Sequence, residues 1–284
     1  MLIRRPIQRW FPLFVLPTFL CFCIGFIWPF LQGIYLSFCN FNTPRDAQWV
    51  GFANYIKAFG DAGFVHAFWN TAGFAVVSIV LINVFAFFIA YALTQKLKGA
   101  NLFRTVFFMP NLIGGVVLGY IWAMIFDAIL KRYSTYLTAN ATYGFWGLVI
   151  LVSWQQIGYM MIIYIAGLQS VPGDMLEAAQ IDGADKWAQM RNVVLPSILA
   201  TIVIMLITRI GSLLNIGYEK VLLLYNSNTF VTADVVSTFA NRYGLEGASK
   251  GIASAAEMMN NVVGMLLVIG ANTIARKASD TSLY

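Results

Sequence analysis

The sequence predicts an all-α integral membrane protein that crosses the bilayer six times. Of its 284 residues, 60% are hydrophobic and only 11% are charged, and the mean hydropathy is +0.73. A soluble domain carries about 25% charged residues, so this deficit is too large for a water-soluble fold. The apolar residues also fall in continuous runs of the roughly 20 residues that a helix needs to cross the hydrocarbon core. Continuous runs favour helices over the alternating strands of a membrane barrel.

Six runs are long enough to span, and each predicts one helix. In chain order they are Phe11–Phe38, Trp69–Thr94, Thr105–Phe126, Phe145–Leu168, Leu195–Ile216 and Ile252–Ile274. The first follows Arg4 and Arg5 as a secretory signal would, but it exceeds the ~7–15 apolar residues of a signal, so we expect a retained helix. The third contains Pro110 and Asn111, which a helix bundle tolerates where neighbours satisfy the freed backbone groups.

The positive charges predict the orientation. Ten Lys and Arg residues fall on one side of the predicted spans and seven on the other, and the dense 96–104 loop and both termini share the richer side. By the positive-inside rule both termini face the cytoplasm. The net charge of +6 does not indicate nucleic acid, because the cations are scattered at segment ends and form no patch. The aromatic-rich outer loop predicts a short interfacial helix over Phe52–Phe59.

A charged segment, residues 170–197, interrupts this apolar chain between the fourth and fifth spans. Pro172 ends the fourth helix, and Asp174 is placed to cap a new helix that runs through Ala179. Gly183 allows a turn after Asp182, residues 184–193 predict a second short helix, and Leu195-Pro196 opens the fifth span. The pattern predicts a helix–turn–helix on the cytoplasmic membrane surface.

The composition of the 170–197 segment suits a docking element. The small side chains of Ala178 and Ala179 allow a partner backbone to approach closely, and Trp187 and Met190 offer an apolar anchor of the kind that interfaces favour. The residues alone leave a second interpretation open, an amphipathic loop that lies at the lipid headgroups.

A resemblance adds to this reading. The spaced set Glu177-Ala178-Ala179, Gly183, Val193, Leu195 and Pro196 resembles the EAA motif, the coupling loop of permease subunits in bacterial ABC importers of the maltose type. It departs from the family pattern only at Val193, where isoleucine is usual. The resemblance covers most of the chain and extends to Phe68–Thr71, Arg104–Pro110, Ala166–Pro172 and, in the branch that imports oligosaccharides, some of them uronate-bearing, to Gly217–Asn226.

The resemblance implies a type I ABC importer (MetI-like) permease fold in a bacterial inner membrane. Residues 1–66 would form the first span and an outer loop, and residues 67–278 the permease core with the 170–197 segment as coupling loop. That loop would enter a cleft on a cytoplasmic ATPase subunit. The residues expected to couple the two subunits are Glu177, Ala178, Ala179, Asp182, Gly183, Trp187, Leu195 and Pro196.

The chain itself shows no site for chemistry. It has no Walker-type Gly-rich loop ending in Lys-Ser/Thr, and no metal or nucleophile constellation. We therefore expect a transport subunit and not an enzyme, with no cofactor of its own, and with ATP and Mg bound by the partner ATPase. The expected assembly contains a second, homologous permease subunit, two ATPase subunits and an extracellular or periplasmic solute-binding protein.

Polar residues inside the predicted spans are candidates to line a translocation path, because they are costly unless paired or facing a cavity. Nine residues form this set: Asn83, Gln155, Gln156, Arg209, Asn215, Tyr218, Glu257, Asn260 and Asn261. The alternative is that they only hold helices together. Arg209 and Glu257 could form an ion pair. Sugar rings could stack on Trp154, Tyr159 or Tyr218, and Arg209 with Lys220 could favour an acidic saccharide.

These features predict the permease subunit of an ATP-driven, binding-protein-dependent importer of a carbohydrate, expected to be an oligosaccharide, that works by alternating access. One alternative is a same-family importer of another small polar solute such as a glycerol phosphate. Another is an ion-driven secondary transporter, which often shows repeated halves; we find no such repeat in the sequence. A membrane enzyme would need an acid, base or metal set at one membrane face.

Overall fold

The computed structural model describes residues 4–95, 97–139, 141–213, 221, 234–247 and 249–279. The chain divides into two compact units. Unit 1 contains residues 1–62 and 240–259, and unit 2 contains residues 63–239 and 260–284. Each unit is described by itself.

Unit 1 begins with the first predicted span. Helix α1 (Arg4–Phe22) continues through a π-helical turn, η1 (Cys23–Ile27), into α2 (Trp28–Ser37). Together they give one apolar span, Trp10–Ser37, and none of the residues in its most apolar window is buried. The predicted first helix is therefore confirmed, and most of its large apolar side chains are exposed.

The loop after this span folds into a small ordered structure. Strand β1 (Cys39–Asn40) pairs antiparallel with β2 (Gln48–Trp49), and α3 (Ala53–Gly60) confirms the short helix expected there. The buried side chain of Asn54 joins the two parts, because its Nδ2 donates to the carbonyl oxygens of Ser37 (2.9 Å) and Cys39 (2.8 Å).

Later residues of unit 1 bond to the same loop. In the π-helical turn η6 (Arg242–Glu246), the Tyr243 hydroxyl donates to the Asp61 carboxylate. This bond raises the pKa of the Tyr243 hydroxyl above its ordinary value, with burial adding to the effect. At the start of α15 (Lys250–Ser279), the Lys250 ammonium donates to the Asn42 carbonyl oxygen over 2.6 Å.

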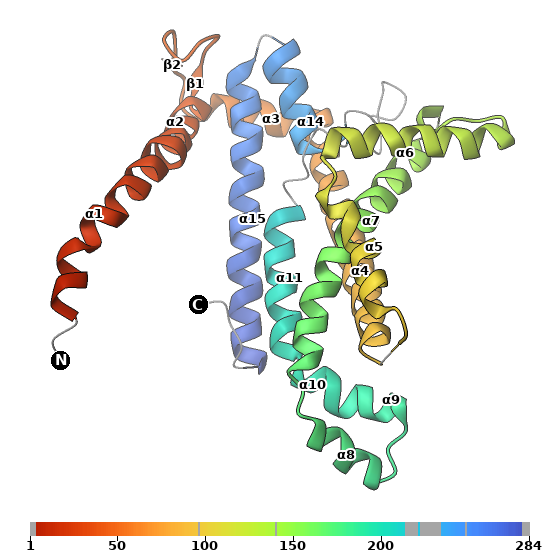
Figure 1. The fold of residues 1–284 in the computed structure, drawn as a ribbon. Coiled ribbons are helices and arrows are strands. Elements are labelled where there is room, and N and C mark those ends of the chain that lie inside the picture. The colour runs from red at the N-terminus through yellow and green to blue at the C-terminus, as the bar shows by residue number, and fades with distance from the viewer. Residues whose placement is uncertain are drawn as a thin grey trace. The chain divides into compact units, whose positions relative to one another are not determined.

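Unit 2 is built on two long helices, α4 (Ala62–Thr94) and α7 (Ala141–Gln169). Between them the chain forms α5, η2, α6, η3 and η4; their bounds are Ala100–Phe108, Met109–Leu112, Gly115–Leu130, Lys131–Tyr133 and Leu137–Ala139. After α7 it forms α8, α9, η5, α10 and α11; their bounds are Gly173–Ile181, Lys186–Gln189, Met190–Val194, Leu195–Ser197 and Leu199–Leu213. Helix α14 (Val236–Asn241) and α15 each contain residues of both units. Figure 1 follows these elements along the chain.

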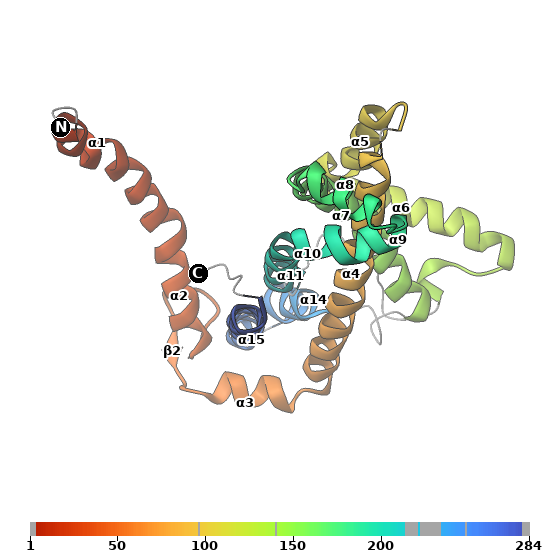
Figure 2. The same cartoon turned by 90° about the horizontal axis from the view of Figure 1, so that it is seen from below.

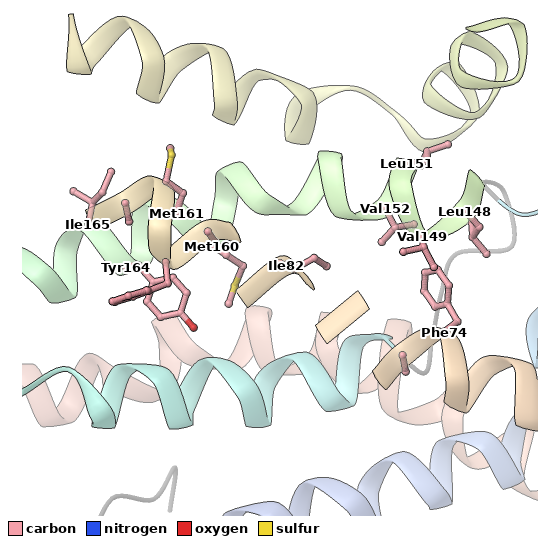
Figure 3. Packing of buried hydrophobic residues seen from close by; sticks show 14 of the residues in the cluster. Phe74, Ile82, Leu148, Val149, Leu151, Val152, Met160, Met161, Tyr164 and Ile165 are labelled. Atoms are coloured by element: carbon pink, nitrogen blue, oxygen red, sulfur yellow. The ribbon is translucent and has the colours of Figure 1, made fainter. Parts of the chain in front are cut away.

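The core of unit 2 lies between α4 and α7. Figure 3 shows buried side chains of α7, including Met160, Met161 and Tyr164, gathered with Phe74 and Ile82 of α4. These side chains are at most 1% exposed, so the two helices form an apolar contact over several turns.

The predicted all-α membrane fold is confirmed, but two of the six spans are not single straight helices. Within the described residues, four helices are long and apolar enough to cross a membrane, or up to six if each of two bent pairs counts as one span. The pairs are Ala100–Leu112 with Gly115–Tyr133, bent by 105°, and Lys186–Ser197 with Leu199–Ser212, bent by 65°.

The prediction of one continuous third helix over residues 105–126 was therefore wrong. Pro110 cannot donate to the helical ladder, so the chain tightens into the 3-10 turn η2, and Gly114 then adopts an extended backbone with ψ 145°. Figure 1 shows α6 crossing at a steep angle to α5 and α7. Pro196 stands near the second bend, where the chain breaks at Ile198 before α11.

Candidate functional site

The first half of the 170–197 segment is helix α8, which begins directly after Pro172. The Pro172 backbone is extended, with ψ 131°, and no side chain caps the helix. The predicted cap at Asp174 is therefore wrong, because Asp174 lies inside the first helical turn. Its carboxylate there faces the positive end of the helix dipole, which is favourable without a capping bond. Helix α8 ends at Ile181, Asp182 is its C-cap, and Gly183 turns the chain with φ +83°, as predicted.

The second half is a composite helix that starts at Lys186 and not at residue 184. Asp185 caps it, since its carboxylate accepts from the Ala188 backbone N–H over 2.7 Å. Gln189 is buried and its Nε2 donates to the Ala184 carbonyl oxygen over 2.8 Å, which closes the turn from the other side. The helix then passes through η5 into α10, where Pro196 stands in the first turn. Figure 1 shows α8 and α9 beyond one end of α7, with α6 near its other end, and Figure 2 shows the same helices from below.

Helix α8 and the composite helix together form a hairpin, which has an exposed apolar face and a buried apolar face. Ile181 is 86% exposed, Trp187 61% and Met175 48%, whereas Met190 is only 4% exposed. Met190 belongs to the buried cluster that α4 and α7 share, so its predicted role in an exposed anchor is wrong. The sequence analysis did not predict that Met175 and Ile181 are exposed apolar residues. Met175 follows Asp174 and Ile181 precedes Asp182, and an apolar residue next to a charge in a surface helix is the signal that could have found them.

The residues predicted to couple the subunits occupy different surroundings. Side chains at Glu177, Ala178 and Asp182 are exposed, with Ala179 half-buried. Toward the C-terminal end Trp187 and Pro196 are exposed, and Leu195 is half-buried.

Glu177 also borders a cavity of about 130 Å³ between α8, the composite helix and the end of α4. Its lining is Tyr91, Gln95, Leu176, Glu177, Gln180, Lys186, Gln189 and Val194. Val194 and Met190 are buried on the inner side of the hairpin, and Met190 belongs to the same buried cluster as residues of α4.

A second cavity, of about 270 Å³, lies within the membrane-spanning part of unit 2. Its lining comes from η2, α7 and α11 and consists of Asn111, Gln156, Tyr159, Met205, Thr208, Arg209 and Ser212. Gln156 stands near the middle of the 29-residue helix α7, so the cavity reaches the central depth of the span.

Arg209 is the charged group of this cavity. Its Nη1 donates to Gln156 Oε1 over 2.7 Å, and its Nε points to Met160 Sδ at 3.2 Å. The guanidinium carbon lies 5.2 Å from the centroid of the Tyr159 ring, a cation–π contact. An arginine at the centre of a membrane helix costs about 2.5–3.5 kcal/mol on insertion scales, and such residues mark substrate or ion pathways.

Of the nine predicted pathway residues, this cavity brings together Gln156 and Arg209. Asn83 is instead buried against the core, where its Oδ1 accepts from the Tyr164 hydroxyl over 2.6 Å. Gln155 donates to the Ile113 carbonyl oxygen over 3.1 Å and so supports the break between η2 and α6. Both therefore hold helices together.

The remaining predicted residues lie elsewhere. Glu257, Asn260 and Asn261 are in α15, where Asn260 is buried and Asn261 exposed. Asn215 and Tyr218 fall outside the described residues, as does Lys220. The ion pair between Arg209 and Glu257 stays a prediction.

The residues predicted to stack on sugar rings also lie in different places. Tyr159 lines the cavity, whereas Trp154 packs edge-on against Trp122 with ring centroids 5.4 Å apart. Sequence reasoning missed four lining residues, Asn111, Met205, Thr208 and Ser212. The last three stand with Arg209 at spacings of three and four residues, which places them on one helix face; that spacing could have found them. Among the described residues, no three His, Cys, Asp or Glu side chains gather as a metal site requires.

Comparison with known proteins gives consistent matches. Residues 82–218, which include the 170–197 segment, match the family described as "Binding-protein-dependent transport system inner membrane component". The chain is 44% identical over 198 residues to the probable starch degradation products transport system permease protein AmyD of Thermoanaerobacterium thermosulfurigenes, covering 66% of this chain and 68% of that protein. It is 31% identical over 201 residues to the sn-glycerol-3-phosphate transport system permease protein UgpA of Yersinia pseudotuberculosis, covering 66% and 68%.

Among solved structures, the chain is similar to one from a bacterial alginate ABC transporter crystallised in complex with an alginate pentasaccharide-bound periplasmic protein. The TM-score is 0.86 at 26% sequence identity, and the match covers 99% of each chain.

Proposed function

Because this chain belongs to the family of inner-membrane components of binding-protein-dependent transport systems, we propose that it is the permease subunit of an ATP-driven importer for an oligosaccharide. The observation that carries the solute class is the 44% identity to a permease for starch degradation products. The full-length similarity to a chain of an alginate transporter supports it.

The glycerol phosphate alternative is less favoured. The chain also resembles a glycerol-3-phosphate permease, but at 31% identity over a region of similar length. An ion-driven secondary transporter does not fit the family. The solute would reach the pore from a periplasmic binding protein, and a second permease subunit would complete the pore.

The 170–197 segment supplies the proposed mechanical link. Helix α8 presents Glu177 and the exposed side chain of Ile181 to a partner ATPase, and α9 presents the exposed side chain of Trp187. On the inner side of the hairpin, Met190 belongs to the buried cluster that contains α4 residues, and Val194 lines a cavity together with Tyr91 of α4. Closure of two ATPase subunits on ATP would displace the hairpin and, with it, the core helices, which alternately expose the central cavity to each side of the membrane. ATP and Mg would bind to the ATPase subunits.

The coupling proposal is tested with two variants in the complete reconstituted importer. Glu177→Gln keeps the shape of the side chain and removes its charge. Gly183→Ala adds a methyl group that meets no atom within 4 Å, so its effect comes only from the φ of +83°, which a non-glycine residue adopts at a cost of about 1–2 kcal/mol.

We expect both variants to lower solute-stimulated ATPase activity and uptake together, by at least about tenfold for Glu177→Gln, since hydrogen bonds to charged groups are worth about 1.5–3 kcal/mol. Asn192→Ala is the matched control, because Asn192 is exposed in the same segment and outside the motif. If both variants match the wild type and the Asn192→Ala control in uptake and ATPase activity, the coupling role is refuted.

A further inference from the structure

The cavity between η2, α7 and α11 holds the cation Arg209, and the described part of its wall supplies no fixed negative partner. None of the seven described residues that line it is an aspartate or glutamate. The neighbours of the Arg209 guanidinium are a neutral amide oxygen, a thioether sulfur and an aromatic ring. Because an embedded charge is costly unless it is compensated, an anion that enters the cavity would be stabilised beside Arg209.

The guanidinium is held in a fixed pose with donors to spare. An arginine has five N–H donors in a planar fork. The bonds to Gln156 and Met160 use two of them, and the other three have no acceptor within the described part of the chain. The Tyr159 ring lies against the guanidinium, which restricts its rotation. A planar fork held in this way matches the two oxygens of a carboxylate.

The other lining groups suit a hydroxylated ring. The Thr208 and Ser212 hydroxyls donate to the Ile204 (2.8 Å) and Arg209 (3.2 Å) carbonyl oxygens of their own helix, so their lone pairs remain to accept from solute hydroxyls. The Asn111 amide can both donate and accept. At about 270 Å³ the cavity is slightly below the roughly 300–1,000 Å³ of pockets for drug-sized ligands, a size for one sugar ring and not for a chain.

We propose that this cavity is a binding site for one anionic unit of the transported solute, a uronate residue of an acidic oligosaccharide, with its carboxylate on Arg209. This inference rests on the proposed function and narrows its substrate class. A phosphate group presents the same chemistry to a guanidinium, so the experiment separates a uronate from a glycerol phosphate.

The test uses the complete importer in proteoliposomes with its binding protein. The probes are trigalacturonate, its fully methyl-esterified form, maltotriose and glycerol 3-phosphate. The ester keeps the sugar backbone and removes the charge, so the ratio of acid to ester uptake reports the carboxylate alone. The variants are Arg209→Gln, Arg209→Lys and, as a control on the same helix face, Thr208→Ala. Dividing each variant by the wild type for the same probe removes the selectivity of the binding protein.

We expect the wild type to take up the acid in preference to the ester. Arg209→Gln should lower acid uptake about tenfold, as expected for loss of a charge-assisted hydrogen bond, and leave ester uptake within about twofold. Arg209→Lys should restore part of the preference, because the charge remains and the fork is lost. Thr208→Ala should lower both probes equally.

Four results would overturn the inference. The first is an acid-to-ester uptake ratio that Arg209→Gln leaves unchanged, and the second is a wild type that takes up maltotriose but not the acid. The third is uptake of glycerol 3-phosphate in place of the acid. The fourth is an equal loss of acid and ester uptake in both Arg209→Gln and Glu257→Gln, which an internal ion pair between these residues would give. Failure of the wild type to take up any saccharide refutes the proposed function itself.

Discussion

Gly158 offers a sharp test of how the central cavity is built. A Cβ placed on this residue of α7 would overlap the carbonyl oxygen of Phe107 and lie 2.8 Å from the Cα of Phe108, both in the α5 backbone. Ordinary van der Waals contact begins at 3.4 Å. For the Cα alone, the two backbones must therefore separate by 3.4 − 2.8 = 0.6 Å in Gly158→Ala, and further for the oxygen.

This displacement has an estimable cost. Overpacking a tight contact costs about 1–3 kcal/mol, and the upper end applies where backbone atoms, which cannot change rotamer, must move. At about 2–4 °C per kcal/mol for a chain of this size, the unfolding temperature should fall by roughly 6–12 °C. Uptake should fall as well, because Gln156 and Tyr159 flank Gly158 and Asn111 follows α5, and all three line the cavity.

The assay is thermal unfolding of the purified complex in detergent, followed by uptake in proteoliposomes. Gly73→Ala in α4 is the matched control, because a Cβ there meets nothing within 4 Å. Removing a glycine from a helix interior should stabilise by about 0.5–1 kcal/mol, so the same substitution should have opposite signs at the two sites. An unfolding temperature for Gly158→Ala equal to or above that of the wild type would show that the close approach of α5 and α7 is not real.

Two further substitutions test local contacts. Asp185→Ala removes the cap on the Ala188 N–H and should cost about 1 kcal/mol locally, which is measured as faster amide hydrogen exchange over residues 186–189. The control Asp174→Ala removes no capping bond and should leave that exchange unchanged. Equal effects of the two variants would contradict the assignment of the cap. Tyr164→Phe removes the hydroxyl that donates to Asn83 and should lower the free energy of unfolding by about 0.6 kcal/mol, the average for such bonds in membrane helices. A shift in unfolding temperature as large as that of Gly158→Ala would mean that this bond does more than join α4 to α7.

Local chemistry explains which parts of the fold could be predicted. Gly183 turns the chain at a positive φ, and Pro172 precedes a new helix, because both preferences belong to the residue itself. The prediction of the helix cap, by contrast, chose the wrong residue. Asp174 and Asp185 are both followed by helical sequence, and only the backbone path shows which carboxylate meets an unsatisfied N–H.

Adjacent residues of one helix show why the cavity could not be predicted in full. Gln155 and Gln156 are identical in type, but successive side chains of a helix point about 100° apart. Gln155 therefore bonds to the Ile113 carbonyl oxygen, and Gln156 bonds to Arg209 in the cavity. Periodicity could place Thr208, Arg209 and Ser212 on one face but could not say that this face meets α7.

The sequence by itself determined the membrane class, the number of apolar segments, the hairpin of the 170–197 segment and the family resemblance, because hydropathy and turn chemistry are properties of short stretches. Only the tertiary structure decided that the third and fifth spans are bent, that Met190 points inward to the core, and that Arg209 shares a cavity with Gln156 and Tyr159. These features depend on which helices pack together, and residues far apart in the chain set that packing jointly.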